Sequence, residues 1–288
     1  MNIINRKSKN VLDCDCGNVI EYSEEDFTLE RTDDSGDFYA IGVKCPDCGC
    51  LHILTPEKFE SKKLLASFTG GRKSLDDYSF AEIKSLCYGS NVPFSVGDGK
   101  KITLKDGSEY VVEIIGFKHD ELSDADKQVS GVTFCFRELL GKDDDGGMYM
   151  NAECTNKGGW KDTERRRWLN DEFFNLLPDD LAAVISPVVK KTCNSKKVVE
   201  TVDKIFLPSE VEIFGKTEYS GEGEGKQYEF FKYWRNRVKG YTDGGYGRWY
   251  WLRSPGSGAS TAFCVVYDDG SAYTNAAGSV GVSPCFAL

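Results

Sequence analysis

Histidine is nearly absent: the 288-residue sequence contains only His52 and His119. Catalytic triads and cysteine–histidine pairs require a histidine beside the nucleophile, and neither histidine lies in such a context. A histidine-rich iron site is excluded by the same count. We interpret His119, which precedes Asp120, as part of a structural or surface pair. The scarcity of histidine therefore favours a non-enzymatic protein.

Long apolar runs and an excess of basic residues are also missing. No stretch has the roughly 20 apolar residues of a membrane-spanning helix, and residues 1–10 are polar, unlike a secretory signal. The net charge is −10, from 36 Lys and Arg against 46 Asp and Glu, which repels phosphate backbones. We expect no nucleic-acid partner, no membrane insertion and a cytoplasmic protein. Release on a virus particle or by cell lysis needs no signal either, so the final location stays open.

Cysteine has two different distributions in this sequence. Five of the 11 cysteines lie between Cys14 and Cys50, and the other six are scattered. We expect scattered cysteines in a cytoplasmic chain to be small buried hydrophobes. They are Cys87, Cys135, Cys154, Cys193, Cys264 and Cys285.

The clustered cysteines form two close pairs, CDCG from Cys14 and CPDCG from Cys45. Two such pairs on tight turns present four thiolates at tetrahedral corners, the arrangement that Zn²⁺ favours. The sequence therefore predicts a structural zinc ion bound by Cys14, Cys16, Cys45 and Cys48. A site closed by four thiolates leaves no coordination position for a substrate, so the zinc is expected to stabilise and not to catalyse.

The segments around these pairs resemble a zinc ribbon, a small β module whose fold depends on the metal. Residues 18–22, 27–31 and 38–43 alternate as strands do, and DDSG at 33–36 is typical of a hairpin turn. Two alternatives stay open at this point. Cys50 or His52 competes for a ligand position, because the first pair has one intervening residue where two are usual. A redox dithiol at Cys45 and Cys48 lacks the βαβ context of that motif.

The rest of the chain reads as strands interrupted by a few helices, which indicates an α+β fold. We expect a ribbon over 1–55, a linker helix within 56–78 that begins at Thr55-Pro56 and ends near residue 67, and one domain over 79–288. Capping boxes begin helices after Ser79 and Ser209. Further helices are expected over 163–176 and 227–238. The expected strands are 101–104, 110–117, 132–136, 203–207, 249–253, 263–267, 271–274 and 282–287.

The C-terminal region carries a family resemblance. WYWLRSP from Trp249 and GVSPCFAL from Gly281 resemble the C-terminal signature of bacterial and phage C-type-lectin-like proteins, W-L-R-S-P followed by G-V-R-P-x-x-x-L. This family is similar to the variable proteins of diversity-generating retroelements, and formylglycine-generating enzymes share the broad fold. The resemblance covers about residues 79–288. One departure is Ser283, which stands where the family has arginine, so an ion pair made by that arginine is absent.

The resemblance implies a C-type-lectin-like scaffold that displays changeable residues to a protein or glycan ligand, as the target protein of a diversity-generating retroelement does. The residues support display independently, because 254–281 is rich in small polar residues and tyrosine, which binding loops favour. We expect the scaffold to include Trp249, Trp251, Leu252, Phe263, Val265 and Val282. The predicted binding residues are Ser257, Ser260, Thr261, Tyr267, Asp268, Ser271, Tyr273 and Asn275.

Other interpretations compete with ligand display. The tail is alternatively an ordinary hairpin-rich segment, or the protein is a bacterial or phage regulatory module that docks a partner through the ribbon. A third hypothesis is an oxidase similar to formylglycine-generating enzymes, which needs Cys264 and Cys285 to meet in space. The acidic run DDDGG at 143–147 lacks the ligand spacing of an EF-hand, so a solvated loop is expected there.

Overall fold

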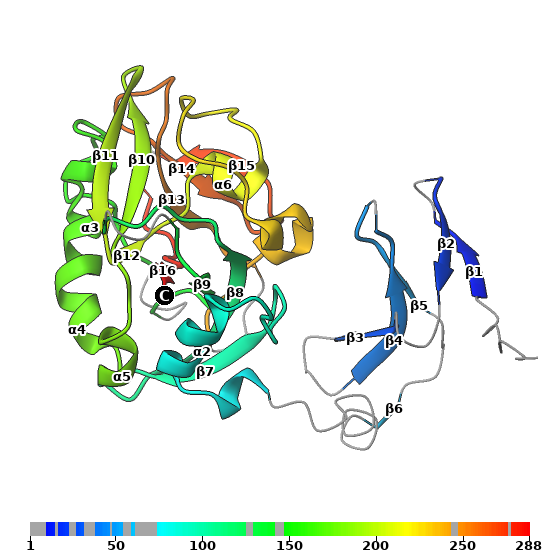
Figure 1. The fold of residues 1–288 in the computed structure, drawn as a ribbon. Coiled ribbons are helices and arrows are strands. Elements are labelled where there is room, and N and C mark those ends of the chain that lie inside the picture. Colours follow the sequence, from blue (N-terminus) through cyan, green and yellow to red (C-terminus); the bar gives the residue numbers. More distant parts are fainter. Residues whose placement is uncertain are drawn as a thin grey trace, which may run out of the picture. The chain divides into compact units, whose positions relative to one another are not determined.

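The chain forms two compact units, Met1–Lys73 and Ser74–Leu288. Figure 1 shows the computed structural model. The described residues are 10–14, 17–22, 27–31, 38–46, 48–53, 59–60, 74–124, 129–141, 147–242, 247–275 and 278–288. The acidic loop predicted at 143–147 lies outside them except for Gly147.

The described part of the first unit is made of antiparallel strands, as the sequence predicts. Strand β1 pairs with β2, and β4 lies between β3 and β5. The bounds are β1 Asn10–Asp13, β2 Val19–Tyr22, β3 Phe27–Arg31, β4 Phe38–Lys44 and β5 Leu51–Ile53.

The linker helix predicted between Thr55 and residue 67 is wrong at two described positions. Phe59–Glu60 form strand β6, which pairs with β4. The edge of β4 offers backbone hydrogen-bond partners to an extended segment, and this pairing overrides the local helix-start signal. The other residues of the predicted helix lie outside the described ones.

Two capping boxes begin helices in the second unit, as expected. Helix α2, Phe80–Cys87, follows Ser79, whose hydroxyl accepts from the Glu82 amide while its own amide donates to Glu82. Helix α6, Glu210–Phe214, begins in the same way after Ser209. Such a box satisfies amides that a helix start leaves without partners.

The helix predicted over 163–176 is present, but it is not uniform. Thr163 caps α3, Glu164–Trp168; a π-helical turn follows over Leu169–Phe173, and α4 ends the segment over Phe174–Leu176. A short helix, α5, follows at Asp179–Ala182.

The helix predicted over 227–238 is wrong. This stretch forms two 3₁₀ helices, Glu229–Lys232 and Trp234–Arg237, separated by an extended residue, Tyr233. The Asn236 side chain donates through Nδ2 to the Phe230 carbonyl at 2.8 Å, and Arg237 Nε donates to the Phe231 carbonyl at 2.8 Å. Side chains thus take carbonyls that an α-helix would pair with amides four residues later. Trp234 is 52% exposed, so the expected apolar face does not form.

An antiparallel sheet of five strands, in the order β12-β16-β9-β8-β7, holds the centre of this unit (Figure 1). Its C-terminal strand β16 lies between β12 and β9, so the chain ends inside the fold and Leu288 is fully buried. The Phe134 and Phe286 rings stack there at 5.4 Å. The bounds are β7 Gly99–Thr103, β8 Glu109–Phe117, β9 Val132–Phe136, β12 Ile205–Phe206 and β16 Cys285–Ala287.

A second antiparallel sheet, β13-β14-β15, carries the C-terminal segment (Figure 1). Its strands are β13 Tyr250–Pro255, β14 Phe263–Val266 and β15 Ala272–Asn275. A hairpin of β10, Val188–Asn194, and β11, Lys197–Asp203, completes the unit. The α+β class is therefore confirmed. Among the described residues, no helix has the length and apolar character needed to span a membrane.

Candidate metal site and binding surface

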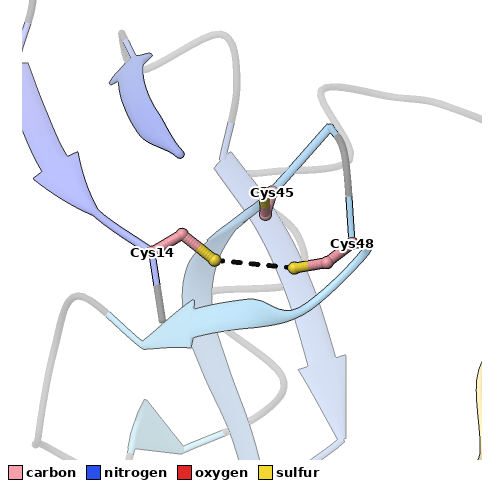
Figure 2. Close-up of side chains that lie close together, drawn as sticks. All are labelled: Cys14, Cys45 and Cys48. Atoms are coloured by element: carbon pink, nitrogen blue, oxygen red, sulfur yellow. Dashed lines mark hydrogen bonds between the residues drawn. The ribbon is translucent and has the colours of Figure 1, made fainter. Parts of the chain in front are cut away.

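Three of the four predicted zinc ligands converge in the first unit. The Sγ atoms of Cys14, Cys45 and Cys48 all lie within 4.8 Å of one another, close enough to bind one metal ion. Figure 2 shows the thiols turned toward a common centre, with Cys14 Sγ and Cys48 Sγ 3.5 Å apart. Cys14 and Cys45 are buried, whereas Cys48 is exposed.

Two similar turns place these thiols. The Gly17 amide donates to the Cys14 carbonyl at 2.8 Å, and the Gly49 amide donates to the Cys45 carbonyl at 2.9 Å. Both glycines have positive φ, +90° and +74°, which glycine adopts without steric strain. The Asn18 side chain donates through Nδ2 to Cys45 Sγ at 3.9 Å. A hydrogen bond of this kind orients a thiolate toward a metal.

The fourth predicted zinc ligand, Cys16, lies outside the described residues. Within the described part of the chain, neither Cys50 nor His52 joins the group of three. Cys50 is exposed, and His52 lies on β5, where its buried Nε2 has no hydrogen-bond partner among the described atoms. The donor set of sulfur atoms suits zinc.

The predicted binding residues all reach the surface of the second unit. Five are exposed, three are half-buried and none is buried. The exposed ones are Ser257, Ser260, Asp268, Ser271 and Tyr273; the half-buried ones are Thr261, Tyr267 and Asn275. Of the predicted scaffold residues, Trp251, Leu252, Phe263, Val265 and Val282 are buried, and Trp249 is half-buried. Placement thus agrees with the sequence, and the binding role stays a prediction.

A row of aromatic rings crosses this surface. Trp249 stacks on Tyr267 at 4.0 Å, Tyr267 lies 4.8 Å from Tyr273, and Tyr273 meets Tyr219 edge-on at 5.8 Å. Partial burial raises the pKa of Tyr267, as do the neighbouring Tyr273 and Tyr219 hydroxyls. Sequence reasoning missed Tyr219, because it precedes β13 by a long stretch of chain and only folding brings it here.

The loop between β13 and β14 is held by long-range hydrogen bonds that local patterns do not reveal. Asn156, which is 7% exposed, donates through Nδ2 to the carbonyls of Gly256, Ala259 and Ala262. Ser257 donates to the Tyr219 carbonyl from both its amide and its hydroxyl. The exposed small side chains of this loop therefore stand on a fixed backbone.

A network of buried charges includes Arg253, which lies on β13. Arg253, from the WLRSP motif, forms an ion pair with Glu212, and Lys190 Nζ bridges Glu212 at 2.6 Å and Asp120 at 2.8 Å. The Tyr228 hydroxyl donates to Asp120 at 2.7 Å. Burial would raise the pKa of Glu212, but the charges of Arg253 and Lys190 outweigh it and lower this pKa to about 2. The motif arginine thus stabilises the interior.

Ligand atoms of His119, Asp120 and Glu212 also lie within 4.8 Å of one another. A metal ion there would compete with Lys190 and Arg253, which already neutralise both carboxylates. His119 stacks on the Tyr228 ring at 3.8 Å, and burial lowers its pKa. The arrangement is that of a structural network.

The signature departure at Ser283 and the two cysteines of the oxidase hypothesis both lie in the described part of the chain. Ser283, which stands at the arginine position of the resemblance, donates its hydroxyl to the Phe136 carbonyl at 2.9 Å, and the Lys239 ammonium donates to the same carbonyl. A lysine from another part of the chain thus supplies a cation there. Cys285 faces Cys135 across β16 and β9, whereas Cys264 lies on β14 in the other sheet. The two cysteines of the oxidase hypothesis are therefore not neighbours in a sheet.

Comparison with known proteins gives one match. A family model described as "Domain of unknown function (DUF6273)" matches residues 130–288, which include the whole aromatic row and, apart from Asp120, the buried network. Searches of curated proteins and of solved structures returned no match.

Proposed function

Since the chain belongs to the DUF6273 family, whose function is unknown, we propose a role from its own side chains. The protein is a non-enzymatic ligand-binding protein that contacts its partner through the exposed residues within 257–275. Its second unit is, in this proposal, a C-type-lectin-like scaffold, and its first unit is a zinc ribbon.

One observation carries the ligand-binding proposal: exposed small polar side chains occur in the same segment as an ordered row of aromatic rings. Ser257, Ser260 and Ser271 are exposed. The Ser257 amide donates to the Tyr219 carbonyl, and the Tyr267 amide donates to the Ser271 carbonyl. Tyrosine supplies contact area with little loss of side-chain entropy, and serine supplies adaptable hydrogen bonds. Strands β13 and β14 beside these residues are buried along their length, whereas β15, which carries Tyr273, is half-buried or exposed. The buried strands therefore form a frame for an exposed surface of mixed chemistry.

The orientation of the rings favours a protein ligand over a glycan. A sugar that stacks on an aromatic ring needs an open ring face. One face of Tyr267 is covered by Trp249, with an angle of 24° between the ring planes, and Tyr273 lies against Tyr219 and Tyr267. The row therefore offers ring edges and hydroxyl groups to a partner, which suits hydrogen bonding and packing at a protein surface.

The zinc proposal rests on the three converging thiols. We infer that Cys16, two residues after Cys14 in the sequence, supplies the fourth thiolate, which would close the site tetrahedrally. A closed site supports a structural role. The metal would stabilise the small first unit, whose described strands are short and surround only a small buried cluster of Cys14, Ile20, Val43 and Cys45.

The retroelement part of the proposal is tested without a protein experiment. A diversified segment requires an adjacent reverse-transcriptase gene and a near-copy of the coding sequence for residues 249–284. Finding both supports diversification of this surface. A genome with neither would restrict the proposal to an undiversified binding protein.

Tyr273→Ala is expected to weaken ligand binding at least about tenfold, because a tyrosine at the centre of an interface contributes about 2 kcal/mol or more and about 1.4 kcal/mol corresponds to tenfold. Tyr273 is 44% exposed, so the free energy of unfolding should change by less than about 1 kcal/mol. The measurement is a binding isotherm of the full chain with a ligand found in a protein and glycan screen.

The matched control is Tyr88→Ala, which removes a tyrosine that is 40% exposed and follows α2. Binding should be unchanged in this variant. Equal losses in the two variants, or none in either, would show that the aromatic row does not recognise the ligand.

A further inference from the structure

Two buried cysteines face each other in the central sheet of the second unit. Cys135 on β9 and Cys285 on β16 are directly opposite partners, and both are fully buried. In the neighbouring pair, the Phe136 amide donates to the Pro284 carbonyl at 2.9 Å. Hydrogen-bonded and non-hydrogen-bonded pairs alternate along an antiparallel ladder, so the two cysteines occupy a non-hydrogen-bonded pair.

This position in the ladder suits a disulfide. The Cα atoms of a non-hydrogen-bonded pair lie about 4.5 Å apart, and disulfides join Cα atoms that are about 4.4–6.8 Å apart. Side chains of directly opposite residues also point to the same face of the sheet. The two thiols can therefore be joined with little movement of β9 and β16.

Polar neighbours make the two thiols chemically unequal. Ser283 Oγ lies 3.2 Å from Cys135 Sγ, and the Lys239 ammonium, which is buried, donates to the Phe136 carbonyl on the same strand. Burial alone would raise the pKa of Cys135. The Cys285 thiol and the Lys239 charge outweigh this effect and lower the pKa to about 7, with a contribution from the Ser283 hydroxyl. Burial and the adjacent Cys135 raise the pKa of Cys285, so Cys135 is the thiol that ionises more readily.

The same row of the sheet leads from Cys135 toward the solvent. On the other side of β9, the opposite partner of Cys135 is Glu113 on β8, so these two side chains also share a face. The Glu113 side chain is 13% exposed and forms an ion pair with Arg137, whose side chain is 37% exposed. Cys135 is therefore one residue away from a solvent-exposed ion pair, and a molecule as small as hydrogen peroxide can reach it when that pair opens.

We propose that Cys135 and Cys285 are a peroxide-sensitive dithiol that closes to a disulfide and joins the C-terminal strand β16 to β9. The Cys135 thiolate attacks one oxygen of hydrogen peroxide, the O–O bond breaks, and the other oxygen leaves as hydroxide, which takes up the proton that Cys135 lost. The Cys285 sulfur then attacks the sulfenic acid on Cys135, which forms the S–S bond and releases a second water. The two thiols are oxidised and the peroxide is reduced to water.

The disulfide would act on the segment that ends the chain. Strand β16 has three residues, all buried, and it lies between β12 and β9. A link between β16 and β9 closes a long loop and restricts the unfolded chain, so the oxidised second unit should be more stable than the reduced one. The site belongs to the five-stranded sheet and does not depend on ligand binding at the aromatic row.

The test treats the full chain with hydrogen peroxide, unfolds it, blocks the remaining thiols with iodoacetamide and maps disulfides by tryptic digestion and mass spectrometry. We expect a link between the peptide of Cys135 and the C-terminal peptide 254–288, which dithiothreitol reverses. That peptide contains Cys264 as well as Cys285, so Cys264→Ser is the matched control and should keep the link. In urea, the oxidised second unit should unfold at a higher concentration than the reduced one, and an unchanged or lower midpoint would contradict the stabilising role.

Two variants separate the roles of the two thiols. In Cys285→Ser the sulfenic acid has no thiol to react with, so Cys135 should be trapped by dimedone; in Cys135→Ser, Cys285 should take up at least about tenfold less dimedone. The mapping of the unsubstituted chain decides the case even where a variant fails to fold. The inference would be overturned by a link from Cys135 to another cysteine, by trapping at Cys285 in place of Cys135, or by two thiols that stay reduced while the exposed Cys154 is oxidised.

Discussion

Cys45→Ser is expected to abolish zinc binding and to unfold the Met1–Lys73 unit. Cys45 is 2% exposed, and its Sγ atom is one of three that converge. Structural zinc sites of this kind contribute about 10–16 kcal/mol of apparent binding free energy, which exceeds what a small β unit otherwise has available. Two measurements test this prediction. One is the zinc content per chain, and the other is amide hydrogen exchange, which reports the loss of β structure in the first unit.

Cys50→Ser is the matched control for this prediction. Cys50 is a neighbouring cysteine that lies outside the group of three, so this variant should retain one zinc ion per chain. Cys16→Ser should behave as Cys45→Ser does if Cys16 is the fourth ligand. Full zinc content in Cys45→Ser, or protection from exchange that survives complete removal of the metal, would contradict a structural zinc site.

Arg253→Met should destabilise the second unit by about 3–5 kcal/mol, because it breaks a buried ion pair and leaves the Glu212 carboxylate with Lys190 as its remaining cation. Arg253 is fully buried and donates to both oxygens of Glu212, as well as to the Leu207 and Glu224 carbonyls. The measurement is chemical denaturation of the full chain, with the transition of each unit followed separately.

Arg137→Met serves as the comparison, because Arg137 forms an ion pair with Glu113 at 2.7 Å while remaining 37% exposed. Solvent screens such a pair, so its loss should change the free energy of unfolding by less than about 1 kcal/mol. If the two variants lost the same stability, the buried network would have no special role in the fold.

The ion pair between Glu212 and Arg253 also predicts that the free energy of unfolding depends on pH. The pKa of Glu212 falls from 4.5 to about 2 in the folded state. A lowered carboxyl pKa stabilises the fold above pH 4.5 and loses this effect as the pH falls toward about 2. Wild-type stability should therefore decline over that interval, and Glu212→Gln should remove part of the decline.

Local signals predicted local structure well in this chain. The capping boxes at Ser79 and Ser209 begin helices where expected, and the glycines after Cys16 and Cys48 mark the turns of the metal site. Each of these features depends on residues a few positions apart. The exposure of the C-terminal small residues was also predictable, because small polar residues are mostly found in contact with solvent.

Features that depend on distant residues could not be predicted in this way. Asn156 holds the Ala262 carbonyl from 106 residues away, and Lys190 reaches Asp120 across 70 residues. The helix expected over 227–238 failed because Asn236 and Arg237 take backbone carbonyls within that stretch. The facing pair of Cys135 and Cys285 was missed because only the pairing of β9 with β16 brings these distant residues together.

The WLRSP motif links the fold to the proposed surface. Arg253 and Ser254 point into the buried network, where Ser254 donates to Glu224, while the loop that follows from Ser257 is exposed. Burial raises the pKa of the Glu224 carboxyl from 4.5 to about 7, although Arg253 and the Ser254 hydroxyl act in the opposite direction. The motif thus anchors the start of a loop whose side chains are free to differ, since few of them contribute to the interior.

The most direct test of the recognition surface is a titration of the screened ligand against the full chain and Ser260→Arg. Ser260 is exposed on the loop between β13 and β14, so arginine fits there without disturbing the interior. The proposal predicts a loss of affinity of at least about a hundredfold at unchanged stability, because a bulky charge would block the contact. Unaltered affinity in Ser260→Arg, with Tyr273→Ala also binding normally, would contradict recognition through this surface.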